Sequence, residues 1–285
     1  MAYLANNTDD CRGHKVLKYL PWNLYTGKNF TSSNQQNKAG ISDEWGFIIC
    51  SPSVALSVAG EPDLISLYGV IGSIQNEYIQ NSCYGIQLAE SDPDKALSIF
   101  SLACGLSIIE KAALEIGDTV VVTGANVLAL RIIEAASLQG ARTMCLVPNM
   151  ESAYLSVIQK IADAVIEFQF NASFDSEFES FEKAACGKII YIDAIGIPSL
   201  INYMVTRLKM FGGLILCRQD LDVYYPLDIY RDVHKKSAWI HYWNILDSTI
   251  EITKMVNLCK RAAKLYECNR VISDAKLPSN LEESF

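Results

Sequence analysis

Strand-like and helix-like patterns of apolar residues alternate over residues 118–242. Thr119–Thr123 is a short β-branched run that ends at Gly124, and Val127–Leu138 then carries apolar residues at helical spacing and stops at Gly140. Continuous apolar runs are typical of parallel strands that are covered on both faces. A glycine just after the last helical residue is a helix-ending signal. The first two predicted elements are therefore a buried strand and the helix that follows it.

The same alternation continues to residue 242. Further strands are predicted at residues 143–147, 164–168, 188–193, 214–217 and 238–242, and further helices at residues 152–161, 174–186 and 199–209. Asn149 or Ser152 would be a suitable N-cap for the helix at 152–161. Three phenylalanines share one face of the helix at 174–186. This order implies right-handed crossovers, so we predict an α/β fold with a doubly wound parallel sheet of the Rossmann type.

The first 115 residues have a different pattern. Strand-like runs at 45–50, 54–58 and 64–71 are broken by Gly and Pro, which suggests a small β-rich unit. A helix is predicted at 92–114, because Ser91-Asp92-Pro93 offers an N-cap and a proline in the first turn. A long amphipathic helix is predicted at 249–266. We therefore expect a β-rich unit with a linking helix at 1–115, a Rossmann-type domain at 116–245, and a C-terminal helix and tail at 246–285 that return toward the β-rich unit.

Composition narrows the class of protein. The chain has 285 residues, of which 50% are hydrophobic and 20% charged, so it is too apolar to be disordered. The net charge is −8 and there is no basic cluster, which argues against nucleic acid as a partner. No apolar run reaches the roughly 18 residues that a membrane helix needs, and the polar N-terminus does not look like a signal peptide. The nine cysteines are scattered, as expected of reduced thiols in a cytoplasmic protein.

Several stretches in the same order resemble the medium-chain dehydrogenase/reductase superfamily, which includes alcohol dehydrogenases and quinone and enoyl reductases. The stretches that carry the resemblance are residues 94–105, 116–125, 140–142, 193–196, 211–217, 233–240 and, more weakly, 71–79. The resemblance covers residues 70–285 well and 1–69 poorly. It implies a nucleotide-binding Rossmann-type domain and a GroES-like β-rich unit. That unit is shorter here than in the family, and the strand that normally closes it near the C-terminus is missing.

The loop that would bind the cofactor departs from the family pattern G-x-G-x-x-G/A. It reads Gly124-Ala125-Asn126-Val127-Leu128-Ala129, so the first glycine is kept and the middle one is Asn126. A Cβ at this position pushes the phosphates outward or tilts the loop. The helix N-terminus at 127–129 would still offer free N–H groups to an anion. The resemblance therefore implies cofactor contacts from Gly124, Ala125, Asn126, Val127 and Leu128.

The choice of nucleotide depends on the end of the second strand. The acid that binds the ribose hydroxyls of NAD is expected about 20 residues after the loop, and this position is Val147. NAD is therefore disfavoured, and Asn149 and Ser152 are polar but uncharged candidates for NADP(H). Asp193 and Gly196 fall at the end of the fourth strand, where such sheets bind ligands, although Asp193 would equally suit a helix N-cap. A Rossmann-type sheet whose crevice is empty or holds another ligand stays open.

Zinc is not expected. Family zinc enzymes use Cys and His ligands in tetrahedral geometry, and the resemblance puts Asp43 where their histidine stands. Cys104 lies where a later cysteine can stand, but it suits a buried helix position better. Near Trp22 and Asn23, where another ligand would fall, there is no Cys or His. These residues do not make a zinc site.

The proton donor is less well defined by the sequence. Zinc-independent members of this superfamily often use a tyrosine or a water, and Tyr19, Tyr25 and Tyr78 are the weak candidates in the β-rich unit. The chain has 14 tyrosines, so the choice among them is open. Of the three histidines, His14 is expected in solvent, whereas His234 and His241 flank the last strand, where a role at a dimer edge is expected.

Three functions remain after these observations. The first is a zinc-independent, NADP(H)-dependent oxidoreductase acting on an activated C=C or C=O of a small molecule. The second is a catalytically inactive or non-redox member of the superfamily that serves as a dimer partner or ligand-binding subunit, favoured by Asn126, Val147 and the shortened β-rich unit. A methyltransferase fits the strand order less well. For the first two we expect a homodimer or heterodimer through the last strand, without nucleic-acid or membrane partners.

Overall fold

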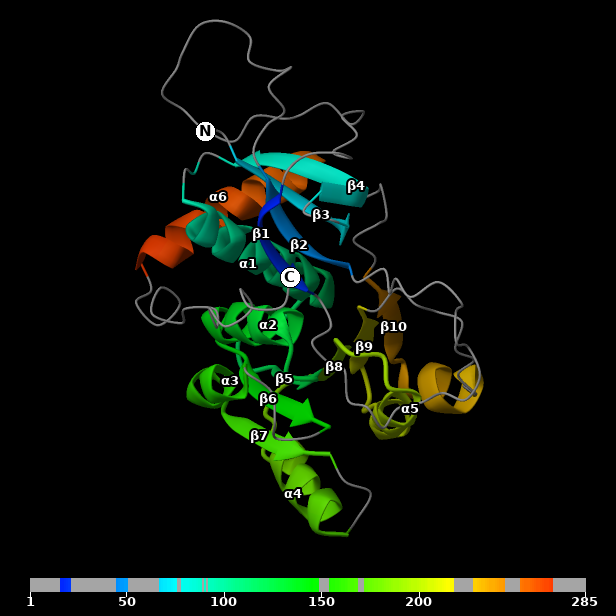
Figure 1. Cartoon of the computed structure of the whole chain (residues 1–285). Helices are drawn as coiled ribbons and strands as arrows, with labels where there is room; N and C mark the ends of the chain where they lie inside the picture. Colours follow the sequence, from blue (N-terminus) through cyan, green and yellow to red (C-terminus); the bar gives the residue numbers. More distant parts are fainter. Residues whose placement is uncertain are drawn as a thin grey trace, which may run out of the picture.

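The computed structural model describes residues 16–21, 45–50, 67–75, 78–88, 90, 92–148, 154–168, 172–217, 228–243 and 252–268. These residues form two separate sheets with helices between and beside them (Figure 1). The run at 54–58, which was also expected to be a strand, lies outside the described residues. No helix in this part of the chain is both long and apolar enough to span a bilayer.

The larger sheet has six parallel strands and confirms the predicted Rossmann-type α/β fold. Its strands are β5 (Thr119–Thr123), β6 (Arg142–Val147), β7 (Ala164–Glu167), β8 (Ile189–Asp193), β9 (Gly213–Leu216) and β10 (Trp239–Tyr242). They are arranged in the order β10-β9-β8-β5-β6-β7. The chain therefore starts in the middle, adds β6 and β7 on one side, and then crosses to β8 on the other. Such a reversal creates a crevice between the ends of β5 and β8.

Helices cover both faces of this sheet. On one face lie α2 (Val127–Leu138) and α3 (Leu155–Ile161), and on the other lie α4 (Ala172–Lys183) and α5 (Pro198–Arg207). In β5, Val120 and Val122 join the core on the α2 face, whereas Val121 joins the core on the α4 face. Both faces of the strand are buried, which explains why it is a continuous apolar run rather than an alternating one.

The start of α3 differs from the prediction. Its N-cap is Tyr154, which makes no side-chain capping hydrogen bond, so the expected cap at Asn149 or Ser152 is wrong. Tyr154 and Ile158 are fully buried in the core. The helix begins where its side chains reach the core, and this packing takes precedence over the capping preference of the polar residues upstream.

The smaller sheet is antiparallel, with strands in the order β1-β2-β3-β4. They are β1 (Val16–Pro21), β2 (Trp45–Cys50), β3 (Leu67–Gln75) and β4 (Tyr78–Leu88). The predicted runs at 45–50 and 64–71 correspond to β2 and the first part of β3. Neither β1 nor β4 was predicted. In β4, polar and apolar residues are mixed without a regular alternation.

Helix α1 (Pro93–Ala112) lies between the two sheets, and α6 (Ile252–Cys268) packs beside it. Helix α1 begins at the predicted N-cap, where the Asp92 carboxylate accepts a hydrogen bond from the Asp94 N–H at 3.0 Å. Helix α1 packs on β1–β3 on one side and on α2 on the other, and α6 packs on α1 (Figure 1). At Gly105 the helices are so close that a Cβ atom would lie 2.4 Å from the carbonyl oxygen of Arg131.

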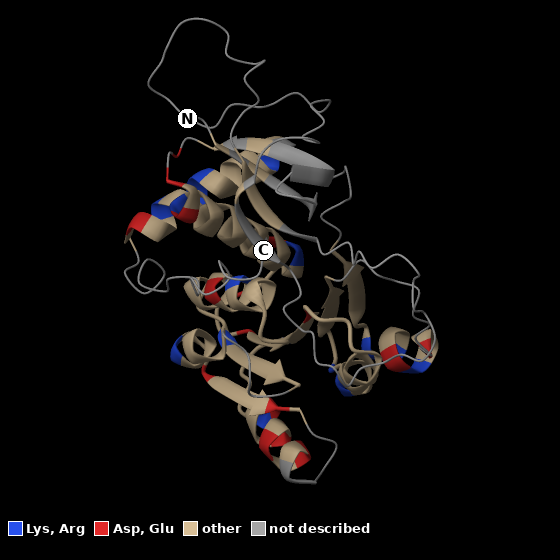
Figure 2. Ribbon diagram, in the orientation of Figure 1, with Lys and Arg blue, Asp and Glu red and all other residues tan. Residues whose placement is uncertain are grey.

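Charges of the two signs gather on different helices. Figure 2 shows acidic residues along α4 and mainly basic residues along α6. Helix α4 lies against the edge of the parallel sheet that ends in β7, whereas α6 lies on α1 and β4. The negative net charge is therefore not spread evenly over the described part of the molecule.

Candidate functional site

The crevice at the reversal of the sheet is bordered by the last residues of β5 and β8. Thr123 and Asp193 are direct neighbours in the parallel pairing. The Thr123 hydroxyl donates to Asp193 Oδ1 at 2.6 Å and accepts from the Ala194 N–H at 3.2 Å. Asp193 Oδ2 accepts from the Gly196 N–H at 2.9 Å. The Asp193 carboxylate thus fixes the conformation of the loop that follows β8.

This arrangement excludes one of the two roles expected for Asp193. The N-cap of α5 is Ile197, and no side chain caps this helix, so Asp193 as a helix N-cap is wrong. The helix begins too far along the chain for the Asp193 carboxylate, which closes the turn to Gly196 instead. Gly196 has a φ of +71°, a backbone conformation that favours glycine.

Gly124 makes the turn that leads from β5 into α2. Its φ is +93°, which again favours glycine, and its carbonyl accepts a hydrogen bond from the Cys145 thiol at 3.0 Å. A Cβ atom here would lie 2.2 Å from Cγ2 of Ile195, which is 4% exposed. The side chain of Ile195 therefore packs against the backbone at Gly124 and leaves no space for a side chain there.

Asn126 is the N-cap of α2 and uses both ends of its carboxamide. Its Oδ1 accepts from the Ala129 N–H at 2.8 Å, and its Nδ2 donates to the Ala194 carbonyl at 3.0 Å. The expectation that the N–H groups at 127–129 are all free is therefore wrong for Ala129, because the side chain of Asn126 is long enough to reach back to it. Ala125, Val127 and Leu128 are buried beside it.

The second half of the expected cofactor site is only partly described. Val147, at the end of β6, is fully buried and offers no hydrogen-bonding side chain. Asn149 and Ser152 lie outside the described residues. Within the described part, the contacts for the adenosine side of a nucleotide therefore remain a prediction.

The structure adds two residues to this edge that the sequence did not indicate. Cys217 follows β9, and its N–H donates to the Asp193 carbonyl at 3.0 Å. Burial, together with the negative charge of Asp193, holds the pKa of the Cys217 thiol well above its usual value, while Lys111 acts in the opposite direction. Lys111, in the last turn of α1, donates to the Tyr242 carbonyl. Cys217 was detectable as a strand-end residue, whereas Lys111 reaches the edge only through tertiary packing.

The structure does not test the other predicted site residues. Tyr19 lies in β1 opposite Ile48, and Tyr78 lies in β4 opposite Gln75. Their side chains are outside the described part, as are Tyr25, Asp43 and His14. Which tyrosine donates a proton therefore stays a prediction.

Cys104 is fully buried in α1, and burial raises the pKa of its thiol well above the usual value. A protonated thiol among apolar side chains is a poor metal ligand, because metals bind the thiolate. Among the described residues, no three His, Cys, Asp or Glu side chains are grouped as a metal site would require.

The two remaining histidines lie near the last strand. His241 is exposed in β10, with its ring centre 4.5 Å from that of Trp239. His234 stacks on Tyr230 at 4.8 Å. Both lie beside the edge of the sheet, and their predicted part in a dimer stays a prediction.

A nucleotide cofactor fits the backbone of this crevice better than it fits the side chains. The turn at Gly124 and the first turn of α2 have the form that a pyrophosphate requires. The position of the middle glycine of the pattern, however, is filled by Asn126, whose side chain hydrogen-bonds to Ala129 and Ala194. The backbone frame therefore suits a dinucleotide, and the side chain at position 126 departs from the pattern.

Comparisons with known proteins agree with the fold. No protein-family model and no curated protein matches the sequence. Among solved structures, mycobacterial Rv1454c complexed with NADPH has a TM-score of 0.60 at 15% identity over 90% of this chain and 80% of its own. CurA in complex with NADPH from Vibrio vulnificus has a TM-score of 0.58 at 15% identity, covering 90% of this chain and 78% of that one.

A third similar structure is an alcohol dehydrogenase zinc-binding domain protein from Burkholderia ambifaria, with a TM-score of 0.52 at 15% identity over 71% of this chain. The chain spans about half of its length, 51%. At such low identity these likenesses show the fold. It is the fold that the resemblance in the sequence implied.

Proposed function

We propose that this protein is an NADP(H)-dependent oxidoreductase that reduces an activated C=C or C=O group of a small molecule without zinc. The observation that carries the proposal is the reversal of strand order between β5 and β8, the place where sheets of this order bind their ligands. Two structures with this fold were determined with NADPH, which supports the choice of cofactor. The proposal that zinc is not used rests on the ligand set, since Cys104 is buried and protonated.

The residues around the crevice suit different parts of this task. The backbone of Gly124, Ala125, Val127 and Leu128 would hold the pyrophosphate at the positive end of the α2 dipole. Asn149 and Ser152 would contact the adenosine side, and the loop from Asp193 to Gly196 would border the nicotinamide side. When bound, the cofactor supplies a hydride to the substrate. Tyr19, Tyr25, Tyr78 or a water would supply the proton.

We also propose a cellular location, a substrate-binding unit and an oligomeric state for this protein. The scattered cysteines favour the cytosol, and the antiparallel sheet β1–β4 would be a GroES-like substrate unit. Among the described strands, β10 pairs only with β9. An outer strand of a sheet can pair with a strand of a second copy or a related chain, so we propose a homodimer or heterodimer through β10.

Calorimetric titration of the full chain with NADPH and NADH tests the proposal. We expect saturable binding of NADPH that is tighter than binding of NADH. Gly124→Ala should abolish this binding, because the new Cβ atom meets Ile195 at 2.2 Å. Gly140→Ala is the matched control, since Gly140 also has a positive φ but its Cβ would meet nothing closer than 3.8 Å. If folded wild-type protein binds neither nucleotide at millimolar concentration, the proposal is wrong.

The second candidate is a non-redox or inactive subunit. It is the reading in which Asn126, in place of the middle glycine, serves only the protein's own hydrogen bonds to Ala129 and Ala194. A folded protein that binds neither nucleotide but forms a dimer by size-exclusion chromatography with light scattering would support this candidate.

A further inference from the structure

An open groove of about 630 Å³ lies between α4 and the end of the parallel sheet formed by β6 and β7. In Figure 1 this end of the sheet lies away from the antiparallel sheet. The volume is within the range of roughly 300–1,000 Å³ that is usual for ligand sites. None of the residues that line the groove belongs to the crevice between β5 and β8. The groove is therefore a second place at which this protein can hold a ligand.

Small side chains on α4 leave room for the groove. Ser176, Ser180 and Ala184 are four positions apart, so they share one side of the helix, and all three are exposed. They extend over roughly 12 Å along the helix axis. On the side of the sheet, the groove is lined by Ala164 and by Ile166, which is part of the apolar core. The groove is thus long and narrow, with hydroxyl groups on one wall and apolar groups on the other.

Opposite charges stand at the two ends of the groove. The guanidinium of Arg142 lies 4.0 Å from the centre of the Phe181 ring, and its Nη1 donates to the Phe181 carbonyl at 3.4 Å. Glu177 also lines the groove, one helical turn before Phe181, so the two charges are separated by roughly 6 Å along α4. Within the described residues, neither Arg142 nor Glu177 forms an ion pair. Both charges are therefore available to a ligand in the groove.

The groove also borders the outer strand on this side of the sheet. Among the strands that the structure describes, β7 pairs only with β6. The alternate residues Ala164 and Ile166 face the groove, so the side chains that a further strand beside β7 directs toward α4 would enter it. Helix α4 crosses from the end of β7 to the start of β8 and so runs antiparallel to β7. Arg142 consequently lies near the start of β7 and Glu177 near its end.

We propose that this groove binds a short peptide in extended conformation, added as a strand antiparallel to β7, with its C-terminal carboxylate on Arg142 and its N-terminal ammonium facing Glu177. Backbone hydrogen bonds to a strand edge supply affinity in this mode of binding, and pockets for alternate side chains supply specificity. Three extended residues span roughly 10 Å, which suits a groove of roughly 12 Å. The apolar wall favours small apolar side chains. The site is separate from the nucleotide crevice, so the inference does not depend on the proposed function.

Calorimetric titration of the full chain with the tripeptide Val-Ala-Val tests the inference. We expect saturable binding with a dissociation constant of about 1 mM or lower. The same peptide with a C-terminal amide should bind about fivefold more weakly, because it loses the pair with Arg142. The N-acetylated peptide should bind about two- to fivefold more weakly, because Glu177 is exposed and its pair with the ammonium is worth less.

Arg142→Met identifies the residue that holds the carboxylate. It should weaken binding of the free peptide about fivefold and leave binding of the amidated peptide unchanged, since the two changes remove the same interaction. Ser180→Trp fills the groove and should abolish binding of every form of the peptide. Lys183→Trp is the matched control on the same helix, because Lys183 is 78% exposed and does not line the groove, and it should bind as the wild type does.

The peptide series needs only the wild-type protein, so the test stands even where a variant does not fold. If the folded wild type binds none of the peptides at about 10 mM, ten times the expected constant, the inference is overturned. It is also overturned if amidation and Arg142→Met weaken binding independently, because the carboxylate then lies elsewhere. Peptide binding that is equal in Ser180→Trp and Lys183→Trp would show that the ligand is held outside the groove. Binding or absence of NADPH has no bearing on these outcomes.

Discussion

Glu134 and Glu182 are buried carboxylates that pair with arginines on opposite faces of the parallel sheet, and their two clusters differ in how far the cations reach water. On α2, Arg131 Nη1 lies 2.6 Å from Glu134 Oε2, with the two side chains 0% and 2% exposed. On the opposite face of the sheet, Glu182 of α4 is 2% exposed, but its partner Arg207 is 19% exposed and Lys209 is 55% exposed. The first cluster is sealed by α1, and the second opens to solvent.

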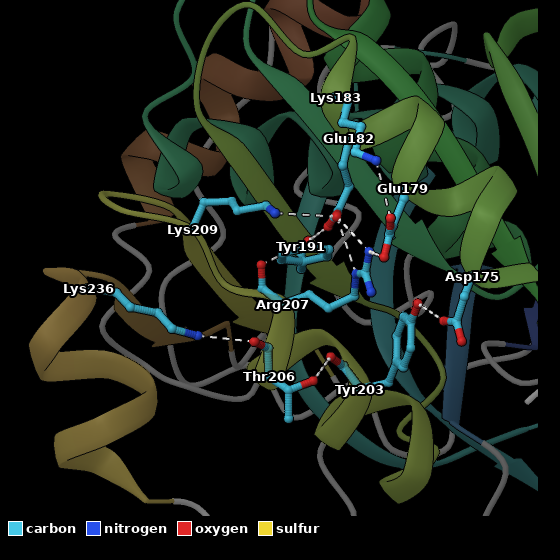
Figure 3. Close-up of polar contacts among 10 residues, drawn as sticks. All are labelled: Asp175, Glu179, Glu182, Lys183, Tyr191, Tyr203, Thr206, Arg207, Lys209 and Lys236. Atoms are coloured by element: carbon cyan, nitrogen blue, oxygen red, sulfur yellow. Dashed lines mark hydrogen bonds and ion pairs between the residues drawn. The ribbon is translucent and has the colours of Figure 1, made fainter. Parts of the chain in front are cut away.

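The clusters also differ in how completely their polar atoms are satisfied. Glu182 accepts from Tyr191 through one oxygen and from Arg207 through the other, at 2.9 and 3.2 Å (Figure 3). Arg131 donates through Nε to Ser101 at 3.0 Å. Within the described residues, however, Arg131 Nη2 and Glu134 Oε1 have no hydrogen-bond partner. Removing one member of a sealed, incompletely hydrogen-bonded ion pair therefore costs far more stability than removing one member of an open pair.

Removal of one member of the sealed pair should have the largest effect. We expect Arg131→Met to lower the free energy of unfolding by about 3–5 kcal/mol, because Glu134 is left buried without a countercharge. Urea denaturation measures this loss. Arg142→Met is the control, since its partly exposed guanidinium lies 4.0 Å from the centre of the Phe181 ring and should contribute about 1 kcal/mol or less. Equal losses in the two variants would contradict the comparison.

The open cluster should tolerate the loss of its charge better. Glu182→Gln should cost about 1–3 kcal/mol, the value of hydrogen bonds to a charged group, because Arg207 and Lys209 still reach water. Glu179→Gln is the matched control: its side chain is 46% exposed and 3.6 Å from Arg207, so about 0.5 kcal/mol or less is expected. A loss in Glu182→Gln as large as that of Arg131→Met would remove the distinction between the clusters.

The two clusters can also be compared through buried tyrosines, whose pKa values make the stability of the protein depend on pH. Burial raises the pKa of Tyr154 to about 12, although nearby Arg131 lowers it, whereas Tyr191 is raised further because Glu182 adds to the effect of burial. The folded state therefore holds the phenolic protons more tightly than the unfolded state, in which the pKa is about 10. The contribution of Tyr154 to the free energy of unfolding is therefore fully present below about pH 10 and is lost as the pH rises toward about 12.

Tyr154→Phe tests this dependence. Between about pH 10 and 12, the free energy of unfolding of the variant should fall less steeply with pH than that of the wild type. The difference in slope should correspond to about one bound proton in the linkage relation. Urea denaturation at several alkaline pH values measures the slope. Tyr230→Phe, at an exposed position in the short helix η2 (Ile229–Val233), is the control. An unchanged slope in Tyr154→Phe would show that the phenol is not held as the structure indicates.

The sequence predicted most of the parallel sheet because burial on both faces leaves a strong local pattern. Thr119–Thr123 and Ile189–Asp193 are nearly pure apolar runs, and each is fully buried. The strand Tyr78–Leu88 was missed because its mixed residues have no such pattern. Its place in the fold depends on pairing with β3, which no local preference determines.

The candidate site was predictable in its position and not in its contacts. Gly124 and Asp193 follow from the rule that ligands bind at the ends of parallel strands. The capping role of Asn126 was also readable, since asparagine directly before an apolar helix is a start signal. Its hydrogen bond to Ala194 and the packing of Ile195 on Gly124 depend on how two distant loops meet in space.

The close contact of α1 with α2 at Gly105 has a consequence for how this protein could be recombined. One apolar core contains Phe47 of β2, Phe100 of α1 and Val122 of β5, so it extends from the antiparallel sheet through α1 to the parallel sheet. A fragment cut between α1 and β5 would expose this interior on both pieces. The change in sequence character near residue 115 is therefore a poor crossover point for building chimeras, and grafts between related folds should carry α1 together with the parallel sheet.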